Sequence, residues 1–164
     1  MLSRLASYKL AAVCCCFLAL AACSKKNTPD LDAGSGPGVN ARPGSEQDFT
    51  TNVGDRVYFA EDQSTLSPEA QETLKRQAEW LQQYANVTVQ MEGHADERGT
   101  REYNIALSAR RATAAREFLI SNGVKASRIS SIAYGKERPV ALCDAEQCWS
   151  QNRRAVTVIT GGAN

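Results

Sequence analysis

One stretch limits what this chain can fold into: a polar loop at residues 93–99, with a glycine at each end, between an apolar run and a long helical pattern. The run at 87–91 alternates apolar and polar residues, as a half-buried strand does. The pattern after the loop begins at Thr100, a suitable N-cap, and ends at Gly123, a residue favoured just beyond a helix. We therefore expect a strand, a loop and a helix, with the loop at a helix N-terminus, where ligands often bind.

Further signals on both sides of this unit define the fold class. Ser67-Pro68-Glu69 predicts a helix start, because serine caps, proline suits the first turn and an acid faces the helix dipole. Other strands are predicted at 56–59, 129–134 and 155–160. This order predicts an α/β (α+β) two-layer sandwich with about four strands and two main helices. We expect this domain to occupy residues 49–164, after a disordered tether.

The first 22 residues have the composition of an export signal: Arg4 and Lys9, then an apolar core at 10–20. Extended to Cys23, the apolar run is still shorter than the roughly 20 residues that a membrane-spanning helix needs. The small residues before Cys23 resemble the lipobox of bacterial lipoproteins, in which that cysteine becomes the lipidated N-terminus. An ordinary signal cleaved after Ala22 is the alternative. Ser24 in the next position is typical of lipoproteins of the outer membrane.

Residues 23–48 are predicted to be a lipidated N-terminus followed by a flexible linker. The segment is rich in glycine, proline and small polar residues, which cannot bury enough apolar surface to fold. About 25 such residues give a root-mean-square reach of roughly 25–30 Å. The whole chain has 19 basic and 18 acidic residues, and this balance argues against a nucleic-acid partner, which requires a basic excess.

Two cysteines remain in the predicted domain, Cys143 and Cys148. An exported chain enters an oxidising compartment, so a disulfide between them is the first interpretation. A zinc site is the alternative, because two thiolates and His94 would supply three ligands. The spacing of the two cysteines is wider than in the usual zinc knuckle, so we expect the disulfide and neither a metal nor another cofactor.

The long helical pattern carries a charge on its apolar face. On a helical wheel Arg111 falls in the same arc as Leu107, together with Asn104 and Ser108. A buried guanidinium must be paired, and Asp96 is the nearest candidate along the chain. Two interpretations remain open at this point. One is a pocket for a small zwitterion, with Arg111 binding its carboxylate and Asp96 its ammonium group, and the other is a structural salt bridge.

Several separated motifs of the chain resemble one family. They are GHADERGT at 93–100, EYN at 102–104, Leu107, RRA at 110–112, YGKERP at 134–139 and SQNRRAV at 150–156. These motifs resemble the OmpA C-terminal-like family, and within it the peptidoglycan-associated lipoproteins. The resemblance spans about residues 53–160, with the lipobox and the tether where such lipoproteins have them.

The resemblance implies an outer-membrane lipoprotein whose domain faces the periplasm and binds the diaminopimelate residue of the peptidoglycan stem peptide without a covalent bond. The family's site residues correspond to Asp96, Arg111, Asn104, Leu107 and Asp62. Residue 61 is commonly apolar in the family but is Glu61 here, which puts the apolar lid of the pocket in question.

The resemblance also implies membership of the Tol–Pal system, which supports the outer membrane and its invagination during cell division. It implies TolB as a protein partner, with residues 134–136 and neighbouring loops as the surface for it. The chain is thus predicted to be a non-enzymatic link between outer membrane and cell wall.

Two other classes of function are the alternatives. A wall hydrolase or zinc amidase needs a catalytic set or three metal ligands, and the chain has a single histidine, His94. A protein-binding module without affinity for the wall would leave Arg111 with a purely structural role.

Overall fold

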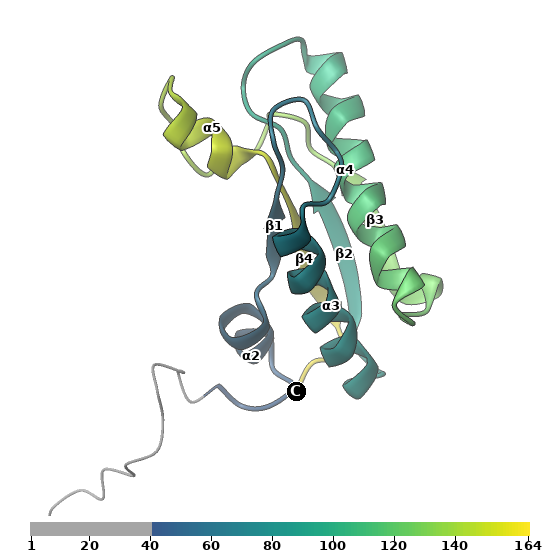
Figure 1. Cartoon of the computed structure of the whole chain (residues 1–164). Helices are drawn as coiled ribbons and strands as arrows, with labels where there is room; N and C mark the ends of the chain where they lie inside the picture. Colours follow the sequence, from purple (N-terminus) through teal and green to yellow (C-terminus); the bar gives the residue numbers. More distant parts are fainter. Residues whose placement is uncertain (1–40) are drawn as a thin grey trace, which may run out of the picture. The chain divides into compact units, whose positions relative to one another are not determined.

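The computed structural model describes residues 41–164, so the predicted signal and Cys23 lie outside the described residues. In chain order the elements are α2 (Glu46–Asp48), a π-helical turn (Phe49–Val53), β1 (Arg56–Tyr58), α3 (Pro68–Gln83), β2 (Thr88–Gly93), α4 (Arg101–Ser121), a 3-10 turn (Ala126–Arg128), β3 (Ile129–Ala133), α5 (Glu146–Asn152) and β4 (Arg154–Gly161) (Figure 1). Among these elements no helix is both long enough and apolar enough to span a membrane.

Both long helices begin at the side chains that the sequence indicated. The hydroxyl of Ser67 accepts a hydrogen bond from the amide of Ala70 at 3.2 Å, and that of Thr100 accepts from the amide of Tyr103 at 3.2 Å. Each bond satisfies an amide that the first turn of a helix leaves without a partner. At the other end of α4, Gly123 has φ +93°, a conformation that glycine adopts without steric cost.

The four strands form one mixed sheet in the order β1-β4-β2-β3. β4 is antiparallel to both β1 and β2, and β2 is parallel to β3 through the α4 crossover. In the register, Gly93 at the end of β2 faces Ala155, and Tyr58 at the end of β1 faces Arg154. The loops that leave β1 and β2 therefore meet the start of β4 at one end of the sheet.

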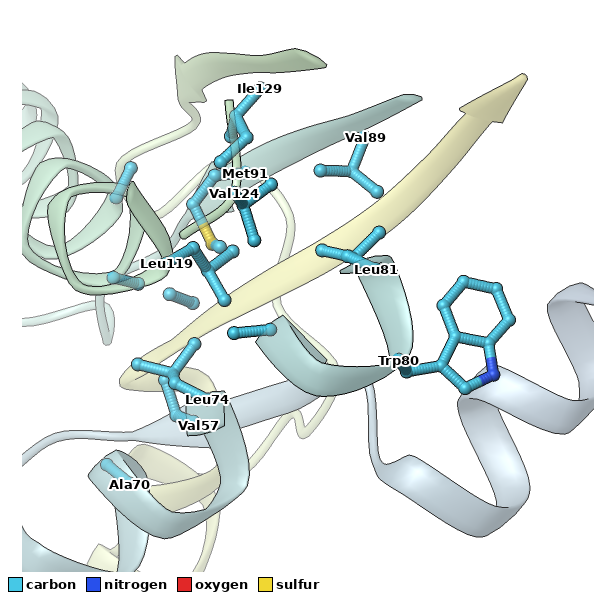
Figure 2. Close-up of a cluster of buried hydrophobic side chains, with 14 of the residues drawn as sticks. Val57, Ala70, Leu74, Trp80, Leu81, Val89, Met91, Leu119, Val124 and Ile129 are labelled. Atoms are coloured by element: carbon cyan, nitrogen blue, oxygen red, sulfur yellow. The ribbon is translucent and has the colours of Figure 1, made fainter. Parts of the chain in front are cut away.

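One face of the sheet packs against α3 and α4, and the core lies between these two layers (Figure 2). The strands contribute alternate residues, such as Val89 and Met91 of β2, and the helices contribute Leu74, Leu81 and Leu119. All five side chains are at most 1% exposed. The predicted two-layer sandwich with four strands and two main helices is confirmed.

Glycine is required where β2 meets α4. A Cβ added to Gly93 would lie 1.9 Å from the carbonyl oxygen of Ser108. This close approach is possible only without a side chain, and it brings α4 against the strand end from which the 94–99 loop departs.

Part of the predicted linker, residues 44–48, forms hydrogen bonds with the rest of the domain. The carboxylate of Asp48 accepts hydrogen bonds from the amide of Gly44 and from the indole of Trp80, both at 2.9 Å. The carbonyl of Gly44 accepts from the amide of Asn164 at 3.1 Å. Tertiary hydrogen bonds therefore hold a segment whose composition alone predicts a linker.

The helix α5 lies between β3 and β4, where the sequence predicted no helix. It has seven residues, and no side chain caps its start at Ala145. A helix this short has little stability by itself, so its sequence carries a weak signal.

Candidate ligand-binding site

A cavity of about 170 Å³ lies at the end of the sheet where the loops after β1 and β2 meet the first turn of α4. Its lining residues are Glu61, Asp62, Asp96, Arg98, Gly99 and Tyr103. Cavities of about 190 and 270 Å³ lie against β1 and beside Asn164, but by their lining residues neither brings several carboxylates to a guanidinium group. The 170 Å³ cavity is therefore the better candidate for a charged ligand.

Two guanidinium groups contact the carboxylate of Asp96. Arg98 donates to it from Nη2 at 2.7 Å and from its backbone amide at 3.1 Å, and Arg153 donates from Nη1 at 3.3 Å. Burial acts to raise the pKa of the Asp96 carboxyl, but the hydrogen bonds from the two arginines lower the pKa below its ordinary value. Asp96 is 7% exposed and keeps its negative charge at neutral pH.

Arg111 does not pair with Asp96, which corrects the pairing expected from the sequence. Its Nε donates to the carbonyl of Gln63 at 2.9 Å, Nη1 to that of His94 at 2.9 Å and Nη2 to that of Ala60 at 3.2 Å. These three carbonyls belong to the two loops that form the cavity, so the guanidinium group fixes the cavity from beneath. The correction has a physical reason: three backbone carbonyls satisfy the donors of a buried guanidinium as a carboxylate does.

The positive charge of Arg111 remains without an ion pair among the described residues. Its side chain has no exposed surface, and its guanidinium lies 5.3 Å from the ring of Phe59. Burial lowers the pKa of Arg111 to about 10, while the nearby charge of Asp96 acts to raise it. The group therefore stays charged at neutral pH in a place that favours an anion.

Asn104 and Leu107 lie beneath the cavity and do not line it. The side-chain amide of Asn104 donates to the carbonyl of Arg98 at 2.8 Å and is 1% exposed. Leu107 is 3% exposed. Both residues and Arg111 are buried residues of α4, as the helical wheel predicted, and Asn104 and Arg111 bond to the loops.

Asp62 is on the rim of the cavity in an unusual backbone conformation. Its φ is +54°, the one positive value outside glycine in the described chain, and its carboxylate accepts a hydrogen bond from the hydroxyl of Tyr103 at 3.2 Å. Backbone strain of this kind gathers at binding sites. Its neighbour Glu61 forms an ion pair with Arg98 at 2.8 Å, so this side of the rim is ionic.

Reasoning from the sequence did not assign several residues that the structure brings to the site. Arg98 and Tyr103 line the cavity, and Arg153 reaches Asp96 from the start of β4. Arg153 also donates to the carbonyl of Phe59 at 3.1 Å and pairs with Glu146 of α5. The antiparallel pairing of β4 with β2 places Arg153 there, and strand order is not readable from the sequence.

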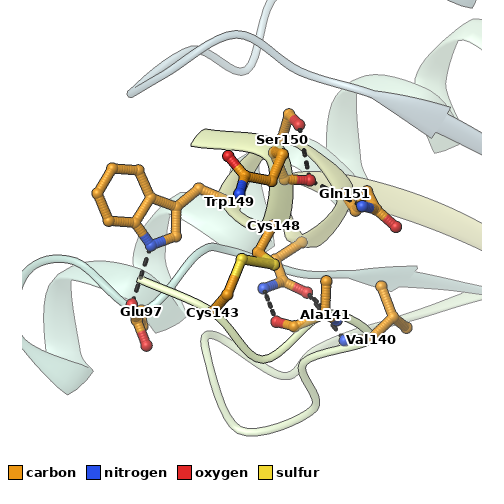
Figure 3. Close-up of a disulfide and its surroundings, with 10 residues drawn as sticks. Glu97, Val140, Ala141, Cys143, Cys148, Trp149, Ser150 and Gln151 are labelled. Carbon is orange, nitrogen blue, oxygen red and sulfur yellow. Dashed lines mark hydrogen bonds between the residues drawn. A yellow bond between two sulfur atoms is a disulfide. The ribbon is translucent and has the colours of Figure 1, made fainter. Parts of the chain in front are cut away.

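A disulfide joins Cys143 to Cys148, with their Cα atoms 5.6 Å apart, and so ties the start of α5 to the preceding loop (Figure 3). The side chain of Asn152 adds a second tie, since it accepts from the amide of Val140 at 2.8 Å and donates to the carbonyl of Ala141 at 2.8 Å. Next to the disulfide, the indole of Trp149 points towards Glu97 and donates to it at 2.9 Å (Figure 3).

His94 is buried rather than placed in the cavity. It is 2% exposed and stacks on the ring of Tyr134, with centroids 5.5 Å apart. Burial, and to a lesser degree the charges of Arg154, Arg138 and Arg56, lower its pKa to about 4. Among residues 41–164, no three His, Cys, Asp or Glu side chains cluster closely enough to hold a metal ion.

The profile of the OmpA family matches residues 58–153, which include the whole cavity. The chain belongs to the OmpA family. It is 58% identical over 149 residues to the peptidoglycan-associated lipoprotein of Mesorhizobium japonicum, covering 90% of this chain and 89% of the relative. It is 60% identical over 147 residues to that of Agrobacterium fabrum, covering 88% and 83%.

The crystal structure of the peptidoglycan-associated lipoprotein from Burkholderia pseudomallei superposes with a TM-score of 0.63 at 39% identity. The match covers 65% of this chain and 90% of the other. The architecture expected from the motifs is thus also that of a solved member of the family.

Proposed function

We propose that this chain is an outer-membrane lipoprotein of the Tol–Pal system whose domain faces the periplasm and binds peptidoglycan without a covalent bond. In this role it supports the integrity of the outer membrane and its invagination during cell division. Three findings support the proposal: membership of the OmpA family, close relatives named for association with peptidoglycan, and a lipobox that ends at Cys23.

The observation that carries the proposal is the pair of opposite charges at the cavity. Asp96 presents a carboxylate at its wall, and Arg111 holds a buried guanidinium beneath it that is bonded to carbonyls alone. Diaminopimelate ends in a carboxylate and an ammonium group on one carbon. Asp96 accepts from the ammonium, and Arg111 donates to the carboxylate, an arrangement that gains strength from burial.

The other predicted residues have supporting parts in this proposal. Asn104 supports the loop of Asp96 through the carbonyl of Arg98, Leu107 packs in the buried layer behind it, and Asp62 offers a second acceptor at the rim. The ligand carboxylate reaches Arg111 when the loop at 60–63 releases one of its carbonyl contacts to that side chain. In this proposal, the strained backbone of Asp62, which lies within this loop, favours the movement that exposes Arg111.

A cell-wall hydrolase is the rival function, and its candidate groups are engaged elsewhere. His94 is buried against Tyr134, and Cys143 and Cys148 are joined in a disulfide. Release of soluble muropeptides from purified sacculi would favour this rival, while retention of intact wall material with the protein would favour binding.

Co-sedimentation of the purified domain with isolated sacculi tests the proposal. Asp96→Ala and Arg111→Leu are expected to abolish sedimentation, and Arg111→Lys to weaken it, because an ammonium lacks the bidentate fork. Arg110→Leu is the matched control, since Arg110 is the adjacent arginine of α4 and is exposed. Thermal melting checks that each variant is folded. Sedimentation of both Asp96→Ala and Arg111→Leu at the level of the natural protein would remove these residues from the site.

TolB is proposed as the protein partner, at residues 134–136 and the adjoining loops. This part rests on the family resemblance. Within the domain, Lys136 donates from Nζ to the carbonyls of Glu97 and Gly99, each at 2.9 Å. The proposed TolB surface therefore touches the loop that carries Asp96. Titration of purified TolB into the domain, with and without soluble stem peptide, tests whether the surface binds and whether the two partners interfere.

A further inference from the structure

The short helix α5 reaches the proposed wall-binding site through Trp149. The guanidinium carbon of Arg98 lies 4.2 Å from the centroid of the Trp149 ring, within the range of a cation–π interaction. The edge of the same indole donates to the carboxylate of Glu97 at 2.9 Å (Figure 3). One aromatic side chain thus contacts Glu97 and Arg98, two consecutive residues of the 94–99 loop that carries Asp96.

We propose that Trp149 is a positioning residue of the wall-binding site: its ring holds the guanidinium of Arg98 beside Asp96 and so fixes the arrangement of charges that the ligand meets. This inference rests on the proposed function, because it assigns a role within the same site. Trp149 itself is absent from the residues that line the cavity, so it acts through Arg98.

Arg98 needs such a support because its side chain is partly exposed. Its side chain is 33% exposed and bonds to two carboxylates, Asp96 at 2.7 Å and Glu61 at 2.8 Å. Exposed ion pairs contribute little free energy, and fixing a long side chain in them costs conformational entropy. Ion pairs alone would therefore hold Arg98 weakly. A flat aromatic face restricts the guanidinium to one plane and leaves its edge free to donate, so stacking on Trp149 selects the geometry that reaches Asp96.

The second guanidinium at Asp96 is held by the same helix. Arg153 donates to Asp96 at 3.3 Å and forms an ion pair with Glu146, in the first turn of α5. Both arginines that contact the Asp96 carboxylate are therefore fixed by α5, one through an aromatic face and one through a carboxylate. The disulfide and the Asn152 contacts keep this seven-residue helix in place.

This arrangement determines what the ligand encounters. The ammonium group of diaminopimelate approaches a carboxylate that is already bonded to two guanidinium groups. It must share Asp96 with Arg98 or move Arg98 towards Glu61, which is already a partner of that side chain. In the proposed function Arg111 binds the ligand carboxylate. The guanidinium group of Arg98, held beside Asp96, adds a second positive charge that attracts this carboxylate and repels a simple diamine.

The test compares Trp149→Leu and Trp149→Phe in the full domain with its disulfide intact. Leucine removes the aromatic face, whereas phenylalanine keeps a smaller aromatic face and lacks the N–H group. The first readout is sacculus co-sedimentation, and the second is the pKa of the Asp96 carboxyl, followed by ¹³C NMR without any ligand. Tyr58→Leu is the matched control, because Tyr58 is an exposed aromatic residue on the outer strand β1.

We expect Trp149→Leu to weaken sacculus binding about fivefold and to raise the pKa of Asp96 towards its ordinary value, since Arg98 is no longer held there. Trp149→Phe is expected to restore both. An unchanged pKa or unchanged binding in the leucine variant, or equal losses in both variants, would overturn the inference. If the natural protein fails to sediment with sacculi, the proposed function fails, whereas the Asp96 titration still decides whether Trp149 positions Arg98.

A further measurement leaves α5 unaltered and covers the case of a misfolded leucine variant. The chain has two tryptophans, so Trp80→Phe leaves Trp149 as the single fluorophore. In that background Arg98→Gln is expected to change the emission of Trp149, because the stacked guanidinium is lost. Identical emission with and without Arg98 would show that the stack does not exist in solution.

Discussion

Both tryptophans of the chain donate an indole N–H to a carboxylate at 2.9 Å, Trp80 to Asp48 and Trp149 to Glu97. Their surroundings differ. Trp80 is 7% exposed and packs between two aromatic rings, Phe49 at 4.9 Å and Tyr84 at 4.6 Å. Trp149 is half-buried and lies against a guanidinium group at the edge of a charged cavity.

The two carboxylates in these regions show the same contrast. Asp48 accepts hydrogen bonds from neutral donors, namely Trp80, Asn52 and the amide of Gly44. Asp96 accepts from two guanidinium groups. The neutral donors at Asp48 join the N-terminal segment to α3, and we call this contact a structural joint. The charged donors at Asp96 occupy the place that a cationic ligand group can take. The comparison teaches that the chemistry of the donors, rather than burial alone, separates a joint from a site.

Truncation of the two tryptophans is expected to give the largest contrast. Trp80→Ala should lower the free energy of unfolding by about 3–5 kcal/mol, because it removes a large side chain from an aromatic cluster. Trp149→Ala should cost much less stability yet weaken sacculus binding. Urea denaturation and co-sedimentation measure the two effects. Similar losses of stability in both variants would contradict the distinction between the regions.

Opening the disulfide is expected to have an intermediate effect, confined to the region of Trp149. Replacement of Cys143 and Cys148 by serine opens a short closed loop. The closure of such a loop contributes roughly 2 kcal/mol to the free energy of unfolding. The freed α5 should hold Arg98 and Arg153 less firmly and so reduce wall binding. Hydrogen exchange provides the control: protection of the amides around Trp80 should stay unchanged. Faster exchange there would show that the two regions are coupled.

The smallest effect is the pH dependence contributed by each carboxylate. Hydrogen bonds hold the pKa of both Asp48 and Asp96 below the ordinary 3.8, although burial acts in the opposite direction at each. The unfolded chain therefore binds these protons first, so the stabilisation is present above pH 3.8 and is lost as the pH falls through the folded-state values.

Asp48→Asn and Asp96→Asn should each make the melting temperature depend less on pH in the acidic range. We expect wall binding at neutral pH to fall in Asp96→Asn alone. Melting temperatures across acidic pH, together with co-sedimentation at neutral pH, provide the comparison. A loss of wall binding in Asp48→Asn would place this joint within the functional site.

Local chemistry made much of the fold predictable. Ser67 and Thr100 start the two helices as expected, because a capping hydroxyl acts within three residues of its own position. The inward side of α4 was also predictable, since a helical wheel places Asn104, Leu107 and Arg111 on one face whatever packs against them. These predictions depend only on neighbours along the chain.

The partners of these side chains were not predictable in the same way. Arg111 bonds to the backbone carbonyls of Ala60, Gln63 and His94. Every residue has a backbone carbonyl, so the sequence does not indicate which ones will accept these bonds. Arg153 reaches Asp96 because β4 lies beside β2, an outcome of sheet order rather than of local preference. The helix α5 escaped prediction for a similar reason, as contacts beyond its seven residues hold it.

The bond from Asn164 to Gly44 has a mechanical consequence. This bond lies beside the start of β2, because Thr88 pairs with Gly161. The loops whose residues line the cavity lie beyond the other end of β2 (Figure 1). If the N-terminal segment is anchored and the cavity grips the wall, tension enters at one end of the sheet and leaves at the other. Such a load runs along the strands and shears their hydrogen bonds together instead of opening them one at a time. Resistance to it depends on the rate of forced unfolding, a property that equilibrium stability does not report.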